Sequence, residues 1–156
     1  MLTRISNAIV KVTELGLWLG FLAMVVTVGL QVGARNLLKL PLIWTLDLAQ
    51  LLFSWLIFIG AAVAFRRGAH YVVDLWPETW TRFHLVLEII SVLTSALVIY
   101  VLIVHGWTLV EIRSTSNVPS LGISHSWMFL PMPICGVLML IFLVEAVQNM
   151  IRRGAQ

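Results

Sequence analysis

The chain has 156 residues, of which 60% are hydrophobic and 11% are charged, and its formal net charge is +3. A soluble domain carries about a quarter of its residues as charged side chains, so this composition excludes an ordinary water-soluble protein. The small, scattered positive charge argues against nucleic-acid binding, and the single cysteine, Cys135, excludes an internal disulfide.

Four long apolar segments follow one another along the chain, over residues 14–35, 44–66, 85–110 and 126–149. Each is close to the length of about 20 residues that a helix needs to cross about 30 Å of hydrocarbon. Their apolar residues are continuous and do not alternate, which favours helices over barrel strands. We therefore predict an all-α membrane protein, a single domain over residues 1–156 with four transmembrane helices.

The first segment has the basic start of a signal peptide, with Arg4 and Lys11. Its apolar stretch is longer than the about 7–15 residues of a signal core, and no convincing small-x-small cleavage site precedes Arg35. We expect a retained helix with Glu14 at the cytoplasmic edge. A small multidrug exporter, which uses a glutamate in its first span, remains an alternative.

The basic residues are divided unequally between the two sides of a four-span protein. The side with both termini and the second connection holds seven of them, Arg4, Lys11, Arg66, Arg67, Arg82, Arg152 and Arg153. The other side holds three, Arg35, Lys39 and Arg113. Because an excess of Lys and Arg marks the cytoplasmic side, we expect both termini in the cytoplasm.

The second connection contains an amphipathic stretch over residues 74–84. Its apolar side chains at helical spacing are Leu75, Trp76, Trp80 and Phe83. Asp74 is a suitable N-cap, and Pro77 is tolerated in a first helical turn. We predict a short helix in the cytoplasmic interface; the alternative is that this stretch simply begins the third span.

The third connection, residues 113–126, is rich in serine, and Pro119 and Gly122 supply turn chemistry. Pro131 and Pro133 follow within the first turns of the fourth segment. Two prolines so close together predict a kinked or irregular start to that helix.

No Asp, Glu, Lys or Arg lies near the centre of any apolar segment. Ion and proton pathways in membranes are normally marked by such residues, so a self-sufficient pump is disfavoured. Phosphate-binding glycine loops, metal-spaced cysteines and nucleophile motifs do not occur. We expect no enzyme activity, no cofactor and no metal.

The four histidines leave one alternative open. His70 and His84 are predicted at the inner side, and His105 and His125 at the outer side. Two such pairs are compatible with a b-type haem electron carrier. However, axial ligands must project into a bundle, and these histidines lie in connections or near helix ends.

Two motif blocks resemble the small membrane subunit of the TRAP (tripartite ATP-independent periplasmic) transporters. The first runs from Trp44 through Asp47 and Gln50, then Trp55 and Gly60-Ala61-Ala62, to Arg66-Arg67-Gly68-Ala69-His70-Tyr71-Val72-Val73-Asp74. The second is Ser116-Asn117-Val118-Pro119-Ser120-Leu121-Gly122-Ile123, followed by Trp127 and the two prolines. The chain departs from the family at Leu46, where an acid is common, and at Gln50, where arginine is frequent.

This resemblance implies a bacterial inner-membrane complex of three proteins. A periplasmic binding protein captures an organic acid, and a large membrane subunit carries it inward with sodium ions. The small, non-catalytic subunit supports the large one and helps dock the binding protein. The substrate itself is not revealed by this chain.

Four groups of residues then receive expected roles. Trp55, Gly60, Ala61 and Ala62 would pack against the large subunit, or alternatively within the bundle itself. Arg66, Arg67, His70 and Asp74 would anchor the cytoplasmic end of the second helix, pairing with one another and with lipid phosphates. Asp47 would pair with Arg35 and Lys39 at the periplasmic helix ends. Asn117, Pro119, Ser120, Leu121 and Gly122 would touch the binding protein.

Overall fold

A computed structural model describes residues 2–39, 42–67 and 81–154. Its helices are α1 (Leu2–Gly33), α2 (Ile43–Arg66), α3 (Thr81–Ser114), α4 (Ser126–Phe129) and α5 (Pro131–Gly154). A π-helical turn, η1 (Ala34–Leu38), ends α1, and two short strands, β1 (Asn117–Val118) and β2 (Ile123–Ser124), lie between α3 and α4. Four helical segments are long and apolar enough to cross a membrane: Ile9–Leu37, Ile43–Arg66, Ile89–Ser114 and Ser126–Gln148. The predicted class, all-α with four transmembrane helices, is confirmed.

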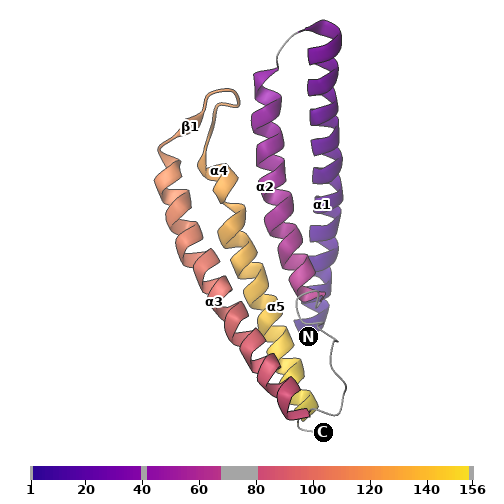
Figure 1. The fold of residues 1–156 in the computed structure, drawn as a ribbon, viewed down its shortest axis with the longest axis vertical. Coiled ribbons are helices and arrows are strands. Elements are labelled where there is room, and N and C mark those ends of the chain that lie inside the picture. The colour runs from indigo at the N-terminus through magenta and orange to yellow at the C-terminus, as the bar shows by residue number, and fades with distance from the viewer. Residues whose placement is uncertain (1, 40–41, 68–80, 155–156) are drawn as a thin grey trace.

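The spans form an open layer in the order α3, α5, α2, α1 (Figure 1). The main contacts join α1 to α2, α2 to α5, and α5 to α3, so α1 and α3 are the outer members. The start of α1 and the end of α5 lie toward the same end of the layer (Figure 1). An even number of spans requires this arrangement.

Two glycines bring α3 and α5 into close contact. A Cβ added at Gly136 of α5 would lie 2.7 Å from Cγ1 of Ile103, and one added at Gly106 of α3 would lie 3.2 Å from Cδ of Pro133. Without a hydrophobic driving force between helices in lipid, small residues at the contact allow backbones to approach and gain dispersion energy. This pair therefore fixes the distance between the two helices.

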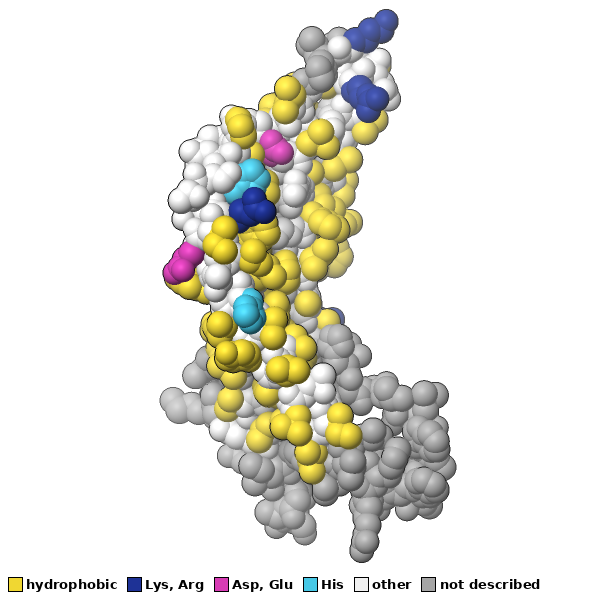
Figure 2. All heavy atoms as spheres, turned by 60° about the vertical axis from the view of Figure 1, so that its left-hand side comes forward, with side chains coloured by type: hydrophobic (Ala, Val, Ile, Leu, Met, Phe, Trp, Pro, Cys, Tyr) yellow, Lys and Arg dark blue, Asp and Glu magenta, His cyan; other side chains and the backbone are white. Residues whose placement is uncertain are grey.

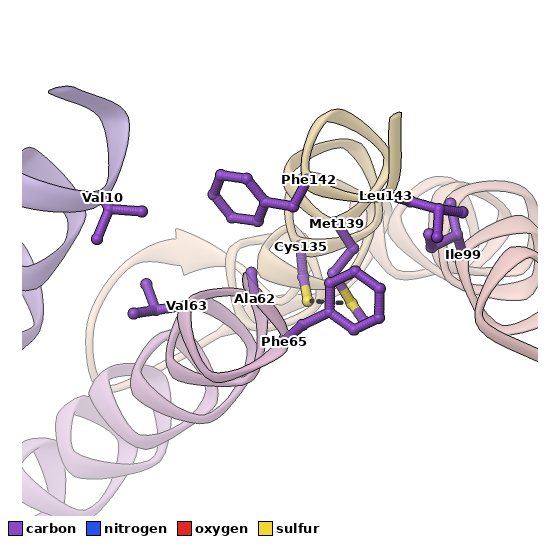
Figure 3. Packing of buried hydrophobic residues seen from close by; sticks show 9 residues of the cluster. All are labelled: Val10, Ala62, Val63, Phe65, Ile99, Cys135, Met139, Phe142 and Leu143. Carbon is purple, nitrogen blue, oxygen red and sulfur yellow. Dashed lines mark hydrogen bonds between the residues drawn. The ribbon is translucent and has the colours of Figure 1, made fainter. Parts of the chain in front are cut away.

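The buried core draws side chains from all four spans (Figure 3). Its members are Val10 of α1, Ala62, Val63 and Phe65 of α2, Ile99 of α3, and Cys135, Met139, Phe142 and Leu143 of α5. The Cys135 thiol points along α5 toward Met139, with 3.6 Å between the two sulfur atoms. Because α5 lies between α2 and α3, it supplies the most core residues.

Large apolar side chains also cover the outside of the layer. Leu19 of α1, Phe53 of α2 and Leu97 of α3 are 59%, 53% and 63% exposed. Monomeric soluble proteins do not leave such continuous apolar surface in contact with water. Figure 2 shows one face, where hydrophobic side chains dominate and most visible charged ones lie toward the end with the β1–β2 connection. Lipid or another membrane protein must cover this surface.

The two predictions about the connections have different outcomes. The fourth span begins irregularly, as expected, because α4 ends at Phe129 and α5 begins at Pro131. Residues 81–84 of the predicted interfacial helix lie at the start of α3, and residues 74–80 lie outside the described part of the chain, so this helix stays a prediction.

Candidate functional site

The end of α2 that lies near the termini is held to its neighbours by two arginines. Nε of Arg66 donates to Oε2 of Glu145 on α5 at 3.2 Å, and the side chains are only 19% and 12% exposed. The Arg66 guanidinium also lies 5.6 Å from the centroid of the Phe142 ring. Such an arrangement offsets the cost of removing both charges from water. This ion pair joins the two central helices of the layer.

Arg67 forms a similar ion pair with the outer helix α1. Its guanidinium donates to the carboxylate of Glu14, with both side chains more exposed than the Arg66 pair. Arg66, the last residue of α2, and Arg67, which follows it, therefore bind α5 on one side and α1 on the other. His70 and Asp74, which we expected to pair with these arginines, lie outside the described residues.

Two side chains in the middle of α2 donate hydrogen bonds to backbone carbonyls near the break between α4 and α5. Pro131 has no N–H, so the carbonyl of Trp127, four residues earlier, lacks its regular helical donor. Nε1 of Trp55 donates to this oxygen at 3.1 Å, and the Ser54 hydroxyl donates to the neighbouring Met128 carbonyl at 2.6 Å. Because backbone groups in a bilayer need internal partners, these two side chains make the irregular helix start possible.

The small-residue patch of α2 points in more than one direction. Ala62 is completely buried in the core. At Gly60, an added Cβ would meet none of the described atoms within 4 Å. Ala62 and the Trp55 indole therefore make contacts within the layer, whereas Gly60 is open to the outside; the packing of this group against the large subunit stays a prediction.

At the opposite end, a short hairpin is tied to α2. Strands β1 and β2 pair antiparallel, with Asn117 opposite Ser124 and Val118 opposite Ile123. Val118 is 2% exposed and anchors the hairpin, and Gly122 adopts a φ of +66° that favours glycine. The Ser120 hydroxyl donates to the Asp47 carboxylate at the start of α2.

The expected pairing of Asp47 with Arg35 or Lys39 is absent from the described ranges, where Asp47 is bonded to Ser120 instead. Arg35 lies in η1 and Lys39 follows it with a φ of 53°, and both side chains are exposed. Long cationic side chains at a helix end reach water at little cost, so no ion pair is needed there. Of the five hairpin residues, Asn117, Pro119 and Gly122 are exposed, and Ser120 and Leu121 are half-buried.

Glu14 and His105, two of the residues behind the alternative functions, are not arranged for them. Glu14 is engaged by Arg67, which follows the end of α2, so it is not the free acid of an exporter. His105 is exposed on α3 and does not project between helices as a haem ligand would. The Nδ1 atom of His125 is buried without a hydrogen-bond partner within the described ranges; His70 lies outside them, and the His84 side chain is not described.

Three residues that form these contacts between helices were not predicted to do so from the sequence. Glu145 received no role in the sequence analysis, although it is the acid nearest the inner end of the fourth segment. Ser54 was not considered, and Ser120 was assigned only to docking. The proline at residue 131 was a usable signal, since it implies a carbonyl at Trp127 in need of a donor.

Comparison with known proteins decides the family. The profile of the DctQ component of the tripartite ATP-independent periplasmic transporters matches residues 24–153. The chain belongs to this family. It is therefore a small permease component of a TRAP transporter, a multi-pass protein of the bacterial inner membrane, and not an enzyme.

Two relatives of this DctQ-family protein are informative. The chain is 34% identical over 157 residues to the sialic acid TRAP transporter small permease protein SiaQ of Vibrio cholerae, covering 97% of this chain and 87% of the relative. It is 28% identical over 143 residues to the sialic acid TRAP transporter permease protein SiaT of Haemophilus influenzae. That match covers 86% of this chain but only 23% of the relative, so the similar segment there belongs to a much longer permease.

Proposed function

We propose that this protein braces the large transport subunit of a TRAP transporter during sodium-driven uptake of an organic acid. One observation carries the proposal: an open apolar layer whose described ionised side chains lie toward the ends of the spans, where two ion pairs tie helices together. Arg66 with Glu145 and Arg67 with Glu14 fasten three helices at one end. Ion and proton pathways are normally marked by ionisable groups at mid-depth, so this layer suits a fixed support better than a conduit.

The longer relative supports the same role. In the Haemophilus permease, a segment similar to this chain is covalently part of a protein more than four times as long. A segment joined to a permease works beside the rest of it at high effective concentration. We propose that the separate chain makes the same association without the covalent link.

Reconstitution in liposomes tests this function. We expect no uptake by this chain alone, and sodium-dependent uptake when the large permease and the binding protein are present with it. The names of both relatives make sialic acid the first substrate to try, beside a panel of other carboxylic acids. Solute movement by this chain alone, or full uptake by the other two proteins without it, would refute the proposal.

We further propose that the hairpin around β1 and β2 helps dock the periplasmic binding protein. Asn117 is exposed on β1 and Pro119 in the turn that follows, while Val118 and the Ser120–Asp47 bond hold the hairpin in place. The variant N117A/P119A should weaken binding-protein-dependent uptake, and the exposed neighbour Thr115 offers a control in T115A. Unchanged uptake by the double variant would remove the hairpin from the docking surface.

This docking requires both termini to lie in the cytoplasm, as the distribution of Lys and Arg indicates. With Cys135 replaced by serine, single cysteines introduced in T115C and Q156C report each side. A membrane-impermeant maleimide added to spheroplasts should label T115C and not Q156C. The reverse pattern would contradict the orientation.

A further inference from the structure

Helix α2 presents three faces, and the described residues of this chain occupy two of them. One face packs against α1, where a Cβ added at Gly20 would lie 3.3 Å from Cδ2 of Leu56. A second face meets α4 through Ser54 and Trp55 and, farther along, α5 through Arg66. The third, which we call the free face of α2, consists of Leu46, Gln50, Phe53, Ile57, Gly60 and Ala64, which recur at helical spacing.

The free face is open along its length. Leu46, Phe53 and Ile57 are 60%, 53% and 49% exposed, and Gln50 between them is exposed as well. Because α2 is a central member of the layer (Figure 1), this exposure is not that of an edge helix. It results from the layer being open where a closed bundle would bury the same side chains.

Gln50 lies too deep for a side chain that faces only lipid. It follows Ile43 by seven residues, about 10 Å along the helix axis at 1.5 Å per residue. Since α2 has 24 residues and is thus about 36 Å long, Gln50 falls well inside a hydrocarbon layer of about 30 Å. Its amide forms no hydrogen bond with any described residue, and an unpaired amide in hydrocarbon is costly.

The far end of the free face is shaped for close contact. Gly60 and Ala64 lie one turn apart, and a Cβ added at Gly60 would meet nothing within 4 Å in the part of the chain that the structure describes. Two small residues at this spacing allow another helix backbone to approach. The polar Gln50 and the small pair thus lie on one line along α2, with Phe53 and Ile57 between them.

We propose that the free face of α2 seats a helix of the large transport subunit, which offers a hydrogen-bonding group to the Gln50 amide and a close backbone to Gly60. This inference rests on the function proposed above and names the surface through which it operates. The occupant follows from the longer relative, in which a segment similar to this chain continues into the rest of a permease. The proposal also moves the expected contact with the large subunit away from Trp55 and Ala62, because these two side chains make contacts inside the layer.

The association of fluorescently labelled small and large subunits, measured by energy transfer in liposomes, tests the proposal. Q50L removes the amide at similar size and makes the helix more lipophilic, so folding should not suffer. G60L blocks close approach. The matched controls are T94L, on an exposed position of α3 whose hydroxyl bonds its own helix, and G16L, on an open position of α1.

We expect Q50L to weaken association about 3- to 20-fold, the range for one hydrogen bond between membrane helices. G60L should weaken it further, and T94L and G16L should behave like the unaltered chain. If Q50L and G60L both associate with the large subunit as strongly as the unaltered chain does, the free face of α2 is not the contact surface, and the proposed function stands. Self-association of this chain that is lost in Q50L would also overturn the proposal, in favour of a second copy. Failure of the unaltered subunits to associate would instead refute the proposed function.

Discussion

Arg66 and Glu145 come from different helices, 79 residues apart in the chain, and meet in a largely buried ion pair. The guanidinium also contacts the carboxylate a second time, from Nη2 to Oε1 at 3.5 Å, and lies near the Phe142 ring. The pair holds α2 to α5, the two central members of the layer. Its location at the end of the spans keeps both charges out of the membrane centre.

The first prediction concerns removal of one partner. E145Q leaves the Arg66 charge partly buried without its counter-ion, and we expect a loss of stability of about 3 kcal/mol, the lower end for breaking a buried pair. Thermal unfolding in detergent measures it. R66M/E145L should regain part of the loss because no lone charge remains. The exposed acid Glu111 supplies the control, E111Q, and an effect of E145Q no larger than that of E111Q would contradict the assignment.

A second prediction couples Trp55 to Pro131. W55F leaves the Trp127 carbonyl without its donor and should cost about 0.6–1.7 kcal/mol, as for hydrogen bonds between membrane helices. In a P131A background the restored backbone N–H can serve that carbonyl, so the same substitution should cost less. Unfolding measurements on the four proteins of this cycle give the coupling energy. Equal costs in both backgrounds would show that the indole does not act through this carbonyl.

The third prediction uses the close packing of α3 on α5. G136A places a methyl group 2.7 Å from Ile103 Cγ1, and we expect a loss of about 1–3 kcal/mol from overpacking. G16A adds the same group on α1, where nothing lies within 4 Å. In that position alanine should stabilise the helix by about 0.5–1 kcal/mol. Unfolding shifts of the same sign for both variants would argue against a close α3–α5 contact.

The fourth prediction distinguishes the two partners considered for Asp47. S120A removes the hydroxyl that bonds the carboxylate, so amide hydrogen exchange in residues 116–124 should become faster. R35Q should leave exchange in that segment unchanged, because Arg35 forms no ion pair with Asp47 in the structure. Mass spectrometry of exchanged peptides measures both. Faster exchange in R35Q and not in S120A would restore the pairing first expected from the sequence.

Several features were predictable from the sequence alone, each for a local reason. The number and approximate position of the spans follow from summed hydrophobicity over segments of about 20 residues. The irregular start of the fourth span follows from Pro131 and Pro133, whose rings act within one turn of their own position. The two motif blocks indicated the family, which the profile match over residues 24–153 confirms.

The direction of each side chain was decided only by the tertiary structure. Trp55, Gly60 and Ala62 lie within three turns of one helix, yet two of them face the layer and one faces outward. Likewise, Arg66 binds Glu145 and Asp47 binds Ser120, both across more than 70 residues of sequence. Hydrophobicity predicts that a helix lies in the membrane. It does not predict which neighbouring helix it contacts, since all faces of the helix are similarly apolar. The order α3, α5, α2, α1 sets the partners, and that order arises from contacts between helices, which no single segment contains.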